Sequence, residues 1–423
     1  MEGWQWLPID VDKISGAISR SVEPRSSRPS LAVLRLKNLS KDEDQEYFVS
    51  GICEDLQSSL SKSHLFDVIA GISSFSFDPQ AVEPQQVGRL LNVRYVVQGS
   101  VRKAGNRIRV SANLVDTELA KEIWADRFDS DIEDIFDLQD NITAALSSAI
   151  IPEITRAEIE RTRTIRISSL SSWDHYLRAL PLMQQLTYDA NREAVSLLTK
   201  SNDQQPRFSS ALAMLARCHV TAAYQFWGET PESELALAQQ ASDLAISADP
   251  DNPTAYDAKA AIHVYSRDYD AAILAARRAI ELDPSLASSY GALAAALAFS
   301  GNSDEALAVC HAADHISPRD PDRSQRQMAI VIAHFVNRDY AAAKAECQKF
   351  ILIKPNWFGV YTLLAASCVY LGQKEAARTA IARLLEIIPG YTIEKHKKRV
   401  WLENEEDRKR LLDGMKKAGL AVS

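Results

Sequence analysis

Five prolines recur at nearly constant spacing through the second half of this 423-residue chain. They are Pro250, Pro284, Pro318, Pro355 and Pro389, and the gaps between them are 34, 34, 37 and 34 residues. A period of this length is typical of stacked helical pairs, because one pair cannot bury its apolar face alone and packs against its neighbours. Proline suits the end of the second helix of each unit, since it cannot continue a helix. The spacing therefore predicts an all-α solenoid.

Small residues and tyrosines keep the same register as the prolines. With each closing proline at position 32, position 8 holds Ala260, Ala294 and Ala365, and position 20 holds Ala272, Ala306, Ala343 and Ala377. Position 15 holds Gly301 and Gly372, where glycine tolerates a positive φ at the turn between helices, and position 4 holds Tyr256, Tyr290 and Tyr361. This pattern resembles the tetratricopeptide repeat. The resemblance implies a superhelix whose concave surface binds partners.

The predicted array extends in both directions from these repeats. Residues 173–201 resemble a first helical pair, and Ser210–Gln225 with Glu232–Ala248 predict a second. Residues 390–423 are predicted to cap the array with an amphipathic helix over Asn404–Ala418, whose apolar face carries Leu411, Leu412 and Met415. We therefore expect about six helical pairs over residues 172–389 and a polar-faced terminal cap, as solenoid ends require.

The first third of the chain has a different pattern. Short apolar or alternating runs predict strands, and two polar-apolar stretches predict helices. The predicted strands are 31–36, 65–70, 95–101, 107–115 and 122–128, and the predicted helices are 54–61 and 84–91, followed by a long helix after Ile132. We expect a loose leader over residues 1–29, a small α/β domain over 30–150 and a helical linker over 151–171. The fold class is α+β overall, an α/β domain followed by an all-α solenoid.

Four segments of the first third resemble a known domain. They are LAVLRLKNLS, QEYFVSGICEDL, NVRYVVQGSVRKAGNRIRV and IWADRFDSDIEDIFDLQDNI, and they are similar to the TolB-like N-terminal domain that precedes tetratricopeptide repeats in many bacterial regulators. Similar chains include the C-terminal halves of rhizobial adenylate/guanylate cyclase-type proteins and of winged-helix transcriptional regulators. The closing sequence NEEDRKRLLDGMKKAGL also resembles the end of the cyclase-type proteins. The sequence departs from these relatives at Arg35 and Leu36, where they carry proline and an aromatic residue.

The resemblance implies a regulatory role without attached chemistry. In those relatives the effector domain lies upstream, whereas only about 29 residues precede the α/β domain in this sequence. Those preceding residues contain neither a class III cyclase domain, with its two metal-binding aspartates, nor a winged helix. We therefore expect a non-catalytic regulatory or scaffold protein in bacterial signalling. Two alternatives stay open: a transcription-regulator subunit acting with a separate DNA-binding partner, and a cyclase-type protein lacking its catalytic domain.

Composition and motifs narrow the classes of function. The formal net charge of -8 argues against a general binder of nucleic acid or anionic membranes. The sequence has no apolar run long enough to cross a bilayer, no secretory signal and no CxxC, which favours a cytoplasmic protein with reduced cysteines. It has no P-loop, GxGxxG, GxSxG or HExxH motif, so no cofactor or catalytic residue is predicted.

Two charged or metal-binding patterns have competing interpretations. Residues 85–110 carry six basic side chains and no acid, which suits either a phosphate-binding patch or a sheet face neutralised by the acid-rich residues 116–140. We favour the neutralised face. Cys310, His311 and His315 are close in sequence, but further ligands are not evident. We therefore favour packing and exposed helix positions over a metal site.

The predicted partner-binding groove has one aromatic residue in each repeat. Its candidate residues are Tyr265, Phe299, Met328, Phe335 and Tyr370. Such a lining suits an apolar or amphipathic peptide. Lysine and asparagine are absent from the groove positions, which argues against a clamp for a peptide carboxylate. The alternative interpretation is that these rings pack between repeats or against the N-terminal domain.

Overall fold

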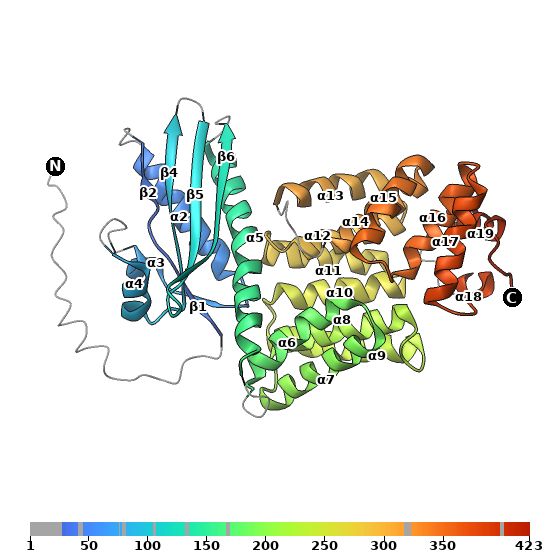
Figure 1. The fold of residues 1–423 in the computed structure, drawn as a ribbon, viewed down its shortest axis with the longest axis horizontal. Coiled ribbons are helices and arrows are strands. Elements are labelled where there is room, and N and C mark those ends of the chain that lie inside the picture. Colours follow the sequence, from blue (N-terminus) through green and yellow to red (C-terminus); the bar gives the residue numbers. More distant parts are fainter. Residues whose placement is uncertain are drawn as a thin grey trace.

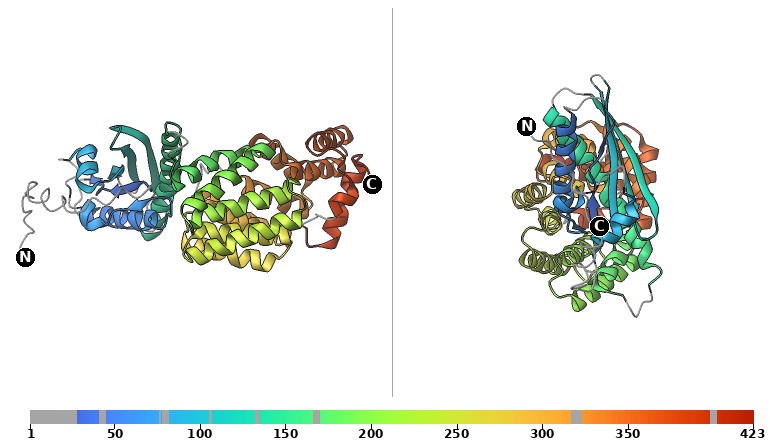
Figure 2. Two further views of the ribbon diagram at one scale, coloured as in Figure 1. Left: turned by 90° about the horizontal axis from the view of Figure 1, so that it is seen from below. Right: turned by 90° about the vertical axis from the view of Figure 1, so that its left-hand side faces the viewer.

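The computed structural model describes residues 28–40, 45–75, 77, 82–104, 107–131, 135–165, 170–316, 323–397 and 402–423. Most of the predicted leader and the turn at Gly105 and Asn106 lie outside these residues, as do Pro318 and the side chain of His315. The chain forms a sheet domain at one end and a helical array that ends in the C-terminal helices at the other (Figures 1 and 2). This arrangement is the α+β architecture that the sequence predicts.

The sheet combines parallel and antiparallel strands. Its members are β1 (Ser30–Val33), β2 (Lys37–Asn38), β3 (Asp67–Val68), β4 (Tyr95–Ala104), β5 (Arg107–Asp116) and β6 (Lys121–Asp131). The order is β3-β1-β4-β5-β6, with β2 also paired to β4. β1 is parallel to β3 and β4, whereas β4, β5 and β6 form an antiparallel meander. All five predicted strands are present, but the strand expected over 65–70 is only two residues long.

Helices cover both faces of this sheet. The alternation in β5 buries Ile108, Val110, Ala112 and Leu114, and these side chains pack with α2 (Gln45–Ser61) and α5 (Ile135–Thr162). The opposite face packs with α4 (Pro84–Leu91), which has the predicted bounds. A short helix, α3 (Gly71–Ser74), follows β3. The half-buried pattern of the hairpin strand therefore identified the sheet face correctly.

Helix α5 crosses the boundary predicted at residue 150. Ile150 and Ile154 are buried in the core that the sheet shares with α2. The helix runs crosswise between the sheet and the ends of the array helices (Figure 1). It contacts the first array helix, α6 (Ser172–Gln185), and also α13 (Ser303–Ile316), which lies much later in the chain. Residues 151–162 are therefore part of a wall shared by the two parts of the protein.

Within the described residues, the helices α6 to α17 form six antiparallel pairs, as predicted. Besides α6 and α13, they are α7 (Tyr188–Gln204), α8 (Ser209–Gln225), α9 (Pro231–Ala248), α10 (Pro253–Ser266), α11 (Tyr269–Leu282), α12 (Ala287–Phe299), α14 (Ser324–Val336), α15 (Tyr340–Ile353), α16 (Phe358–Tyr370) and α17 (Lys374–Ile387). The alanines at positions 8 and 20 of the repeats are fully buried. Small side chains at these positions allow the helices to approach closely.

The turns inside the repeats share one backbone conformation. Gly301 and Gly372 have φ values of 93° and 73°, as their position predicts. Arg267 and Arg338 occupy the same position in the other two repeats and have φ values of 62° and 63°. The turn geometry is therefore kept by the repeat even where the residue is not glycine.

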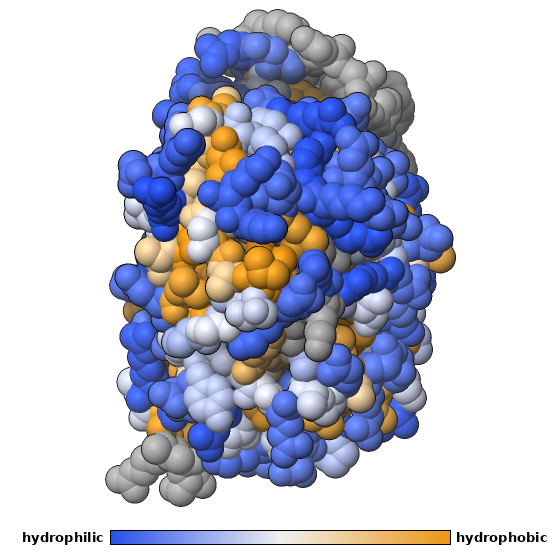
Figure 3. Space-filling model, turned by 90° about the vertical axis from the view of Figure 1, so that its right-hand side faces the viewer, coloured by the Kyte–Doolittle hydropathy of each residue, from blue (hydrophilic) through white to orange (hydrophobic). Residues whose placement is uncertain are grey.

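The chain ends with α18 (Ile393–Lys397) and α19 (Glu405–Lys417). α19 packs on α16 and buries Leu411 and Met415, with Asn404 as its N-cap. Seen from this end, apolar side chains gather in the upper half of the surface and hydrophilic ones surround them (Figure 3). Among the helices that the structure describes, none has the length and apolar content to span a membrane.

Candidate functional site: a cavity inside the helical array

The inner faces of the first helices of successive pairs enclose a cavity of about 620 Å³. Most of its wall is apolar. Tyr265 of α10, Phe299 of α12 and Met328 of α14 line it, so three of the five predicted groove residues meet at one site. Residues from α5, α6 and α8, from the segment before α16 and from α16, α18 and α19 also contribute to the wall.

The other two predicted groove residues lie beneath the C-terminal helix. Phe335 is completely buried, and the Arg410 guanidinium of α19 stands 5.7 Å from its ring centroid. The Tyr370 hydroxyl donates a hydrogen bond to the carbonyl oxygen of Arg410 over 2.8 Å. For these two rings the structure favours packing within the chain, with α19 rather than the N-terminal domain as the neighbour. The sequence predicted a cap but gave no sign of which aromatic residues it would cover.

The array closes on itself around the cavity. Tyr224, at the end of α8, stacks on Trp357 and Phe358, with ring centroids 4.4 Å and 4.7 Å apart. Lys354 Nζ also donates a hydrogen bond to the carbonyl oxygen of Gln184 in α6 over 3.0 Å. The first two helical pairs therefore contact the segment that leads into the last pair, and the concave face becomes a partly enclosed cavity.

Sequence analysis did not single out Trp357 as a cavity residue. One signal was present in the repeat register, where Trp357 and Phe358 take the places of Leu286 and Ala287. Two adjacent large rings at this point have no counterpart in the earlier repeat. Their contact with Tyr224 depends on the curvature of the whole array, which the sequence alone does not show.

One ion pair stands in the cavity wall. Arg217 of α8 donates a hydrogen bond through Nη1 to the carboxylate of Asp257 in α10. Asp257 is 2% exposed, and burial raises the pKa of its carboxyl while Arg217 and the neighbouring Ser288 and Ser289 oppose this rise. A buried pair of this kind positions α8 against α10 and places charge beside an otherwise apolar space.

The charged groups that line the cavity are mostly basic. Arg156 of α5, Arg217 and Lys354 are cationic, whereas Asp257 supplies the carboxylate among the described lining residues. His396 also lines the cavity, but burial lowers its pKa to about 4, so its imidazole is neutral near pH 7. The lining is therefore locally positive in a chain whose formal net charge is -8.

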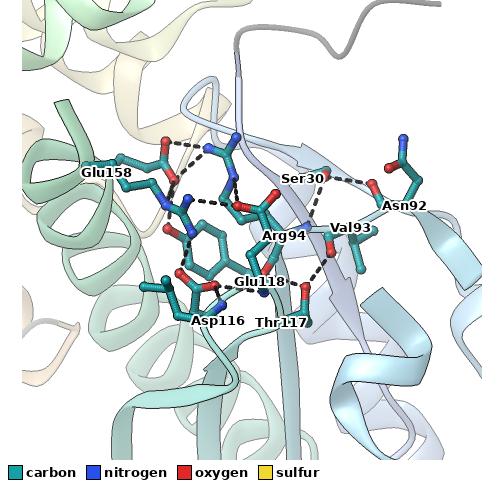
Figure 4. A network of polar contacts seen from close by, with 11 residues as sticks. Ser30, Asn92, Val93, Arg94, Asp116, Thr117, Glu118 and Glu158 are labelled. Atoms are coloured by element: carbon teal, nitrogen blue, oxygen red, sulfur yellow. Dashed lines mark hydrogen bonds and ion pairs between the residues drawn. The ribbon is translucent and has the colours of Figure 1, made fainter. Parts of the chain in front are cut away.

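The wall that α5 contributes is fixed to the sheet by a buried polar network (Figure 4). Arg94 Nη1 donates to both carboxylate oxygens of Glu158, over 2.8 and 2.7 Å, and the Tyr95 hydroxyl donates to the same carboxylate over 2.7 Å. Arg161 of α5 donates to Asp116 over 2.6 Å and to Glu118 over 2.8 Å. Ile151, Thr155 and Ile159 of the same helix line the cavity.

Burial and the adjacent Glu158 raise the pKa of Tyr95, which keeps its phenol protonated as the hydrogen-bond donor. Glu158 and Asp116 are both nearly inaccessible to solvent. The network therefore pairs opposite charges inside the fold. It connects the sheet domain to the helix that closes one end of the cavity.

Three of the six basic side chains over residues 85–110 form ion pairs with acids. Arg109 contacts Asp129 at 2.6 Å, Arg107 contacts Asp131 at 3.9 Å, and Arg94 pairs with Glu158. These contacts favour a neutralised sheet face over a phosphate-binding patch.

The Cys310 and His311 side chains point to different environments. Cys310 is buried, with its Sγ donating to the carbonyl of Arg326 over 3.7 Å, while His311 is exposed. Across the part of the chain that the structure describes, no group of three or more His, Cys, Asp or Glu side chains could hold a metal ion.

Comparison with known proteins supports the helical-repeat assignment. Residues 253–286 match the tetratricopeptide repeat family. A protein of Rhizobium meliloti (strain 1021) named "Putative adenylate cyclase 3" is 35% identical over 245 residues, which cover 57% of this chain and 42% of the relative. The chain thus spans less than half the length of this curated relative.

Solved structures of repeat proteins are also similar to parts of the chain. A tetratricopeptide repeat protein from Parabacteroides merdae is 16% identical, with a TM-score of 0.38, and covers 66% of this chain and 94% of that one. PilW, a type IV pilus biogenesis factor, is 17% identical, with a TM-score of 0.34, and covers 47% of this chain and 90% of its own. The matched repeat and the six stacked pairs define the helical part as a tetratricopeptide-like solenoid. The TolB-like assignment of the N-terminal domain stays a prediction.

Proposed function

We propose that this chain is a non-catalytic regulatory or scaffold protein that binds a partner protein through the concave face of its array. The observation that supports this most is the apolar wall built by successive repeats from Tyr265, Phe299 and Met328. Tetratricopeptide-like arrays present such a surface to apolar or amphipathic peptide segments. A cytoplasmic location in a bacterial signalling pathway belongs to the same proposal.

The ionisable groups at the cavity suit a structural role better than a catalytic one. A general acid or base works best with a pKa near the operating pH and within reach of a reacting atom. Asp257 is engaged by Arg217, and His396 lies 2.8 Å from the Tyr391 hydroxyl through Nδ1, with a pKa of about 4. Both groups are engaged by neighbouring side chains, which suits a structural role.

A second candidate function follows from the 35% identity to the relative named as an adenylate cyclase. On this proposal the chain corresponds to a cyclase-type protein without its catalytic domain and acts in cyclic-nucleotide signalling. The purified chain is then expected not to convert ATP or GTP to a cyclic nucleotide with Mn²⁺. Measurable turnover would contradict both this candidate and the non-catalytic proposal. A transcription-regulator subunit with a separate DNA-binding partner is the remaining alternative, and it rests on the resemblance of the N-terminal domain alone.

Site-specific photo-crosslinking in the source cell tests partner binding. A benzophenone amino acid at Phe299, which lines the cavity, is expected to capture a protein partner. The matched control places the same group at Leu274, which is 70% exposed on α11. A partner captured at Phe299 and not at Leu274 supports the concave face. Equal capture at both positions would contradict it. So would capture of a partner only when the benzophenone amino acid replaces Tyr47 of the sheet domain.

A further inference from the structure

We infer that the cavity binds a small amphipathic organic anion, whose apolar body lies inside the array and whose acidic group meets the basic side of the lining. This inference goes beyond the proposed partner binding, and either can hold without the other. It follows from the enclosure of the cavity, the character of its wall and the sign of its charged groups.

The size and partial enclosure of the cavity suit a small ligand. The Tyr224 ring against Trp357 bounds the space on one side and α5 lines another, while the rest of the cavity is partly open. Its volume of about 620 Å³ falls within the range of roughly 300–1,000 Å³ that is typical of small-molecule sites. The space is therefore sized for a compact molecule.

The wall requires a ligand with a substantial apolar part. Val264, Phe299, Met328 and Ile332 line the cavity from three successive repeats, and Trp357 lines it from the closing segment. Apolar surface of this kind gains free energy when a hydrocarbon or aromatic body displaces water from it. A purely polar metabolite would leave most of this wall without a complementary partner.

The charged groups select the sign of the polar end. Lys354 Nζ donates to the neutral carbonyl of Gln184, which holds the ammonium at the cavity without neutralising it. Arg217 is balanced by Asp257, and Arg156 is 2.8 Å from Glu153, an acid outside the lining. When these two ion pairs are set aside, the positive charge that remains among the described lining residues is that of Lys354. A cavity with low-dielectric walls focuses this field on an anion.

The same ligand would touch the N-terminal half of the protein. Ile151, Thr155 and Ile159 of α5 line the cavity, and Glu158 and Arg161 of the same helix hold it to the sheet. A ligand bound in the cavity therefore contacts the helix that joins the two parts of the protein. A regulatory protein could use this contact to couple ligand binding to its sheet domain.

Calorimetric titration of the purified full chain tests the inference with three probes of one chain length: decanoate, decylammonium and decanol. We expect saturable binding of decanoate and weaker binding of the cation and the alcohol. Lys354→Gln should weaken decanoate by about tenfold or more, as expected for one charged hydrogen bond. The matched control is Lys349→Gln, since Lys349 lies in the same helix region, pairs with Glu346 and is not part of the lining.

A second variant tests the location independently of charge. Ala295 lines the cavity, so Ala295→Phe should fill part of it and weaken decanoate at least tenfold, with the circular dichroism spectrum unchanged. The inference is overturned if the folded wild-type chain binds decanoate without saturation, if decylammonium binds as tightly, or if neither Lys354→Gln nor Ala295→Phe weakens binding. Because this experiment uses the purified chain alone, its failure is distinct from a failure to crosslink a protein partner.

Discussion

The ring of Tyr224 stacks on the ring of Trp357, with centroids 4.4 Å apart and planes 25° from parallel. Tyr224 ends the first helix of the second pair, and Trp357 precedes the first helix of the last pair. This contact closes the superhelix and turns a concave groove into a cavity. Aromatic pairs of this geometry contribute about 0.5–1.5 kcal/mol to stability in addition to the free energy gained from the area they bury.

Gly359→Ala tests the contact that Tyr224 makes, because its effect on the free energy of unfolding should change sign when the Tyr224 hydroxyl is removed. A Cβ at Gly359 would overlap the Tyr224 hydroxyl, so the substitution should destabilise the chain by about 1–3 kcal/mol through overpacking. In a Tyr224→Phe background the hydroxyl is gone, and the greater helix propensity of alanine should make the same substitution neutral or stabilising by up to ~1 kcal/mol.

Urea unfolding of the two single variants and the double variant measures this coupling. The prediction requires that Tyr224→Phe rescue Gly359→Ala. Equal destabilisation in both backgrounds would mean that Tyr224 does not occupy this place in solution.

Loss of the Glu158 carboxylate should weaken the attachment of α5 to the sheet. Glu158→Ala leaves Arg94 and the Tyr95 hydroxyl without their shared acceptor, and removing one partner of a buried pair costs about 3–5 kcal/mol. The control is Glu160→Ala, two residues away, where an exposed pair with Arg163 should contribute less than about 1 kcal/mol. Chemical denaturation followed by far-ultraviolet circular dichroism compares the two. Similar losses from both variants would argue against the buried network.

The sequence predicted the periodic features of this fold far better than its long-range closures. Pro284 and Pro355 set a register from which the buried Ala272 and Ala343 follow directly, because local helix packing repeats with the period. The same register could not show that α19 would cover Phe335, since that contact depends on where the chain returns after the last repeat. Nor could it place α5 against α13, because the superhelical curvature that joins them accumulates over several units.

The turn position shared by the repeats yields two substitutions of opposite sign. Gly372 has a φ of 73° and open space where a Cβ would lie, so Gly372→Ala should cost about 1 kcal/mol through backbone strain alone. Arg267 has a φ of 62° at the equivalent position, so Arg267→Gly should relieve strain and stabilise the chain by about 0.5 kcal/mol. Thermal melts of the two variants check the signs. Destabilisation by both would show that the Arg267 side chain contributes more than its strained backbone costs.

Acid should loosen the C-terminal cap through His396. This residue of α18 is 3% exposed, and burial lowers its pKa from 6.5 to about 4. Because the pKa of His396 is lower in the folded than in the unfolded chain, the unfolded chain binds the proton more readily. The free energy of unfolding therefore decreases as the pH is lowered from about 6.5 to about 4. Near pH 5 this one group should cost on the order of 2 kcal/mol relative to pH 7.5.

His396→Gln should therefore lower stability at pH 7.5 through lost packing, yet flatten the decline in unfolding free energy between pH 7.5 and 5. His311→Gln is the matched control substitution, since His311 is an exposed histidine on α13. Urea titrations of the three proteins at both pH values measure the difference. A slope that is the same in His396→Gln and in the wild-type chain would show that His396 binds its proton equally well in the folded and unfolded states, because only a group whose affinity for protons differs between the two states makes stability depend on pH.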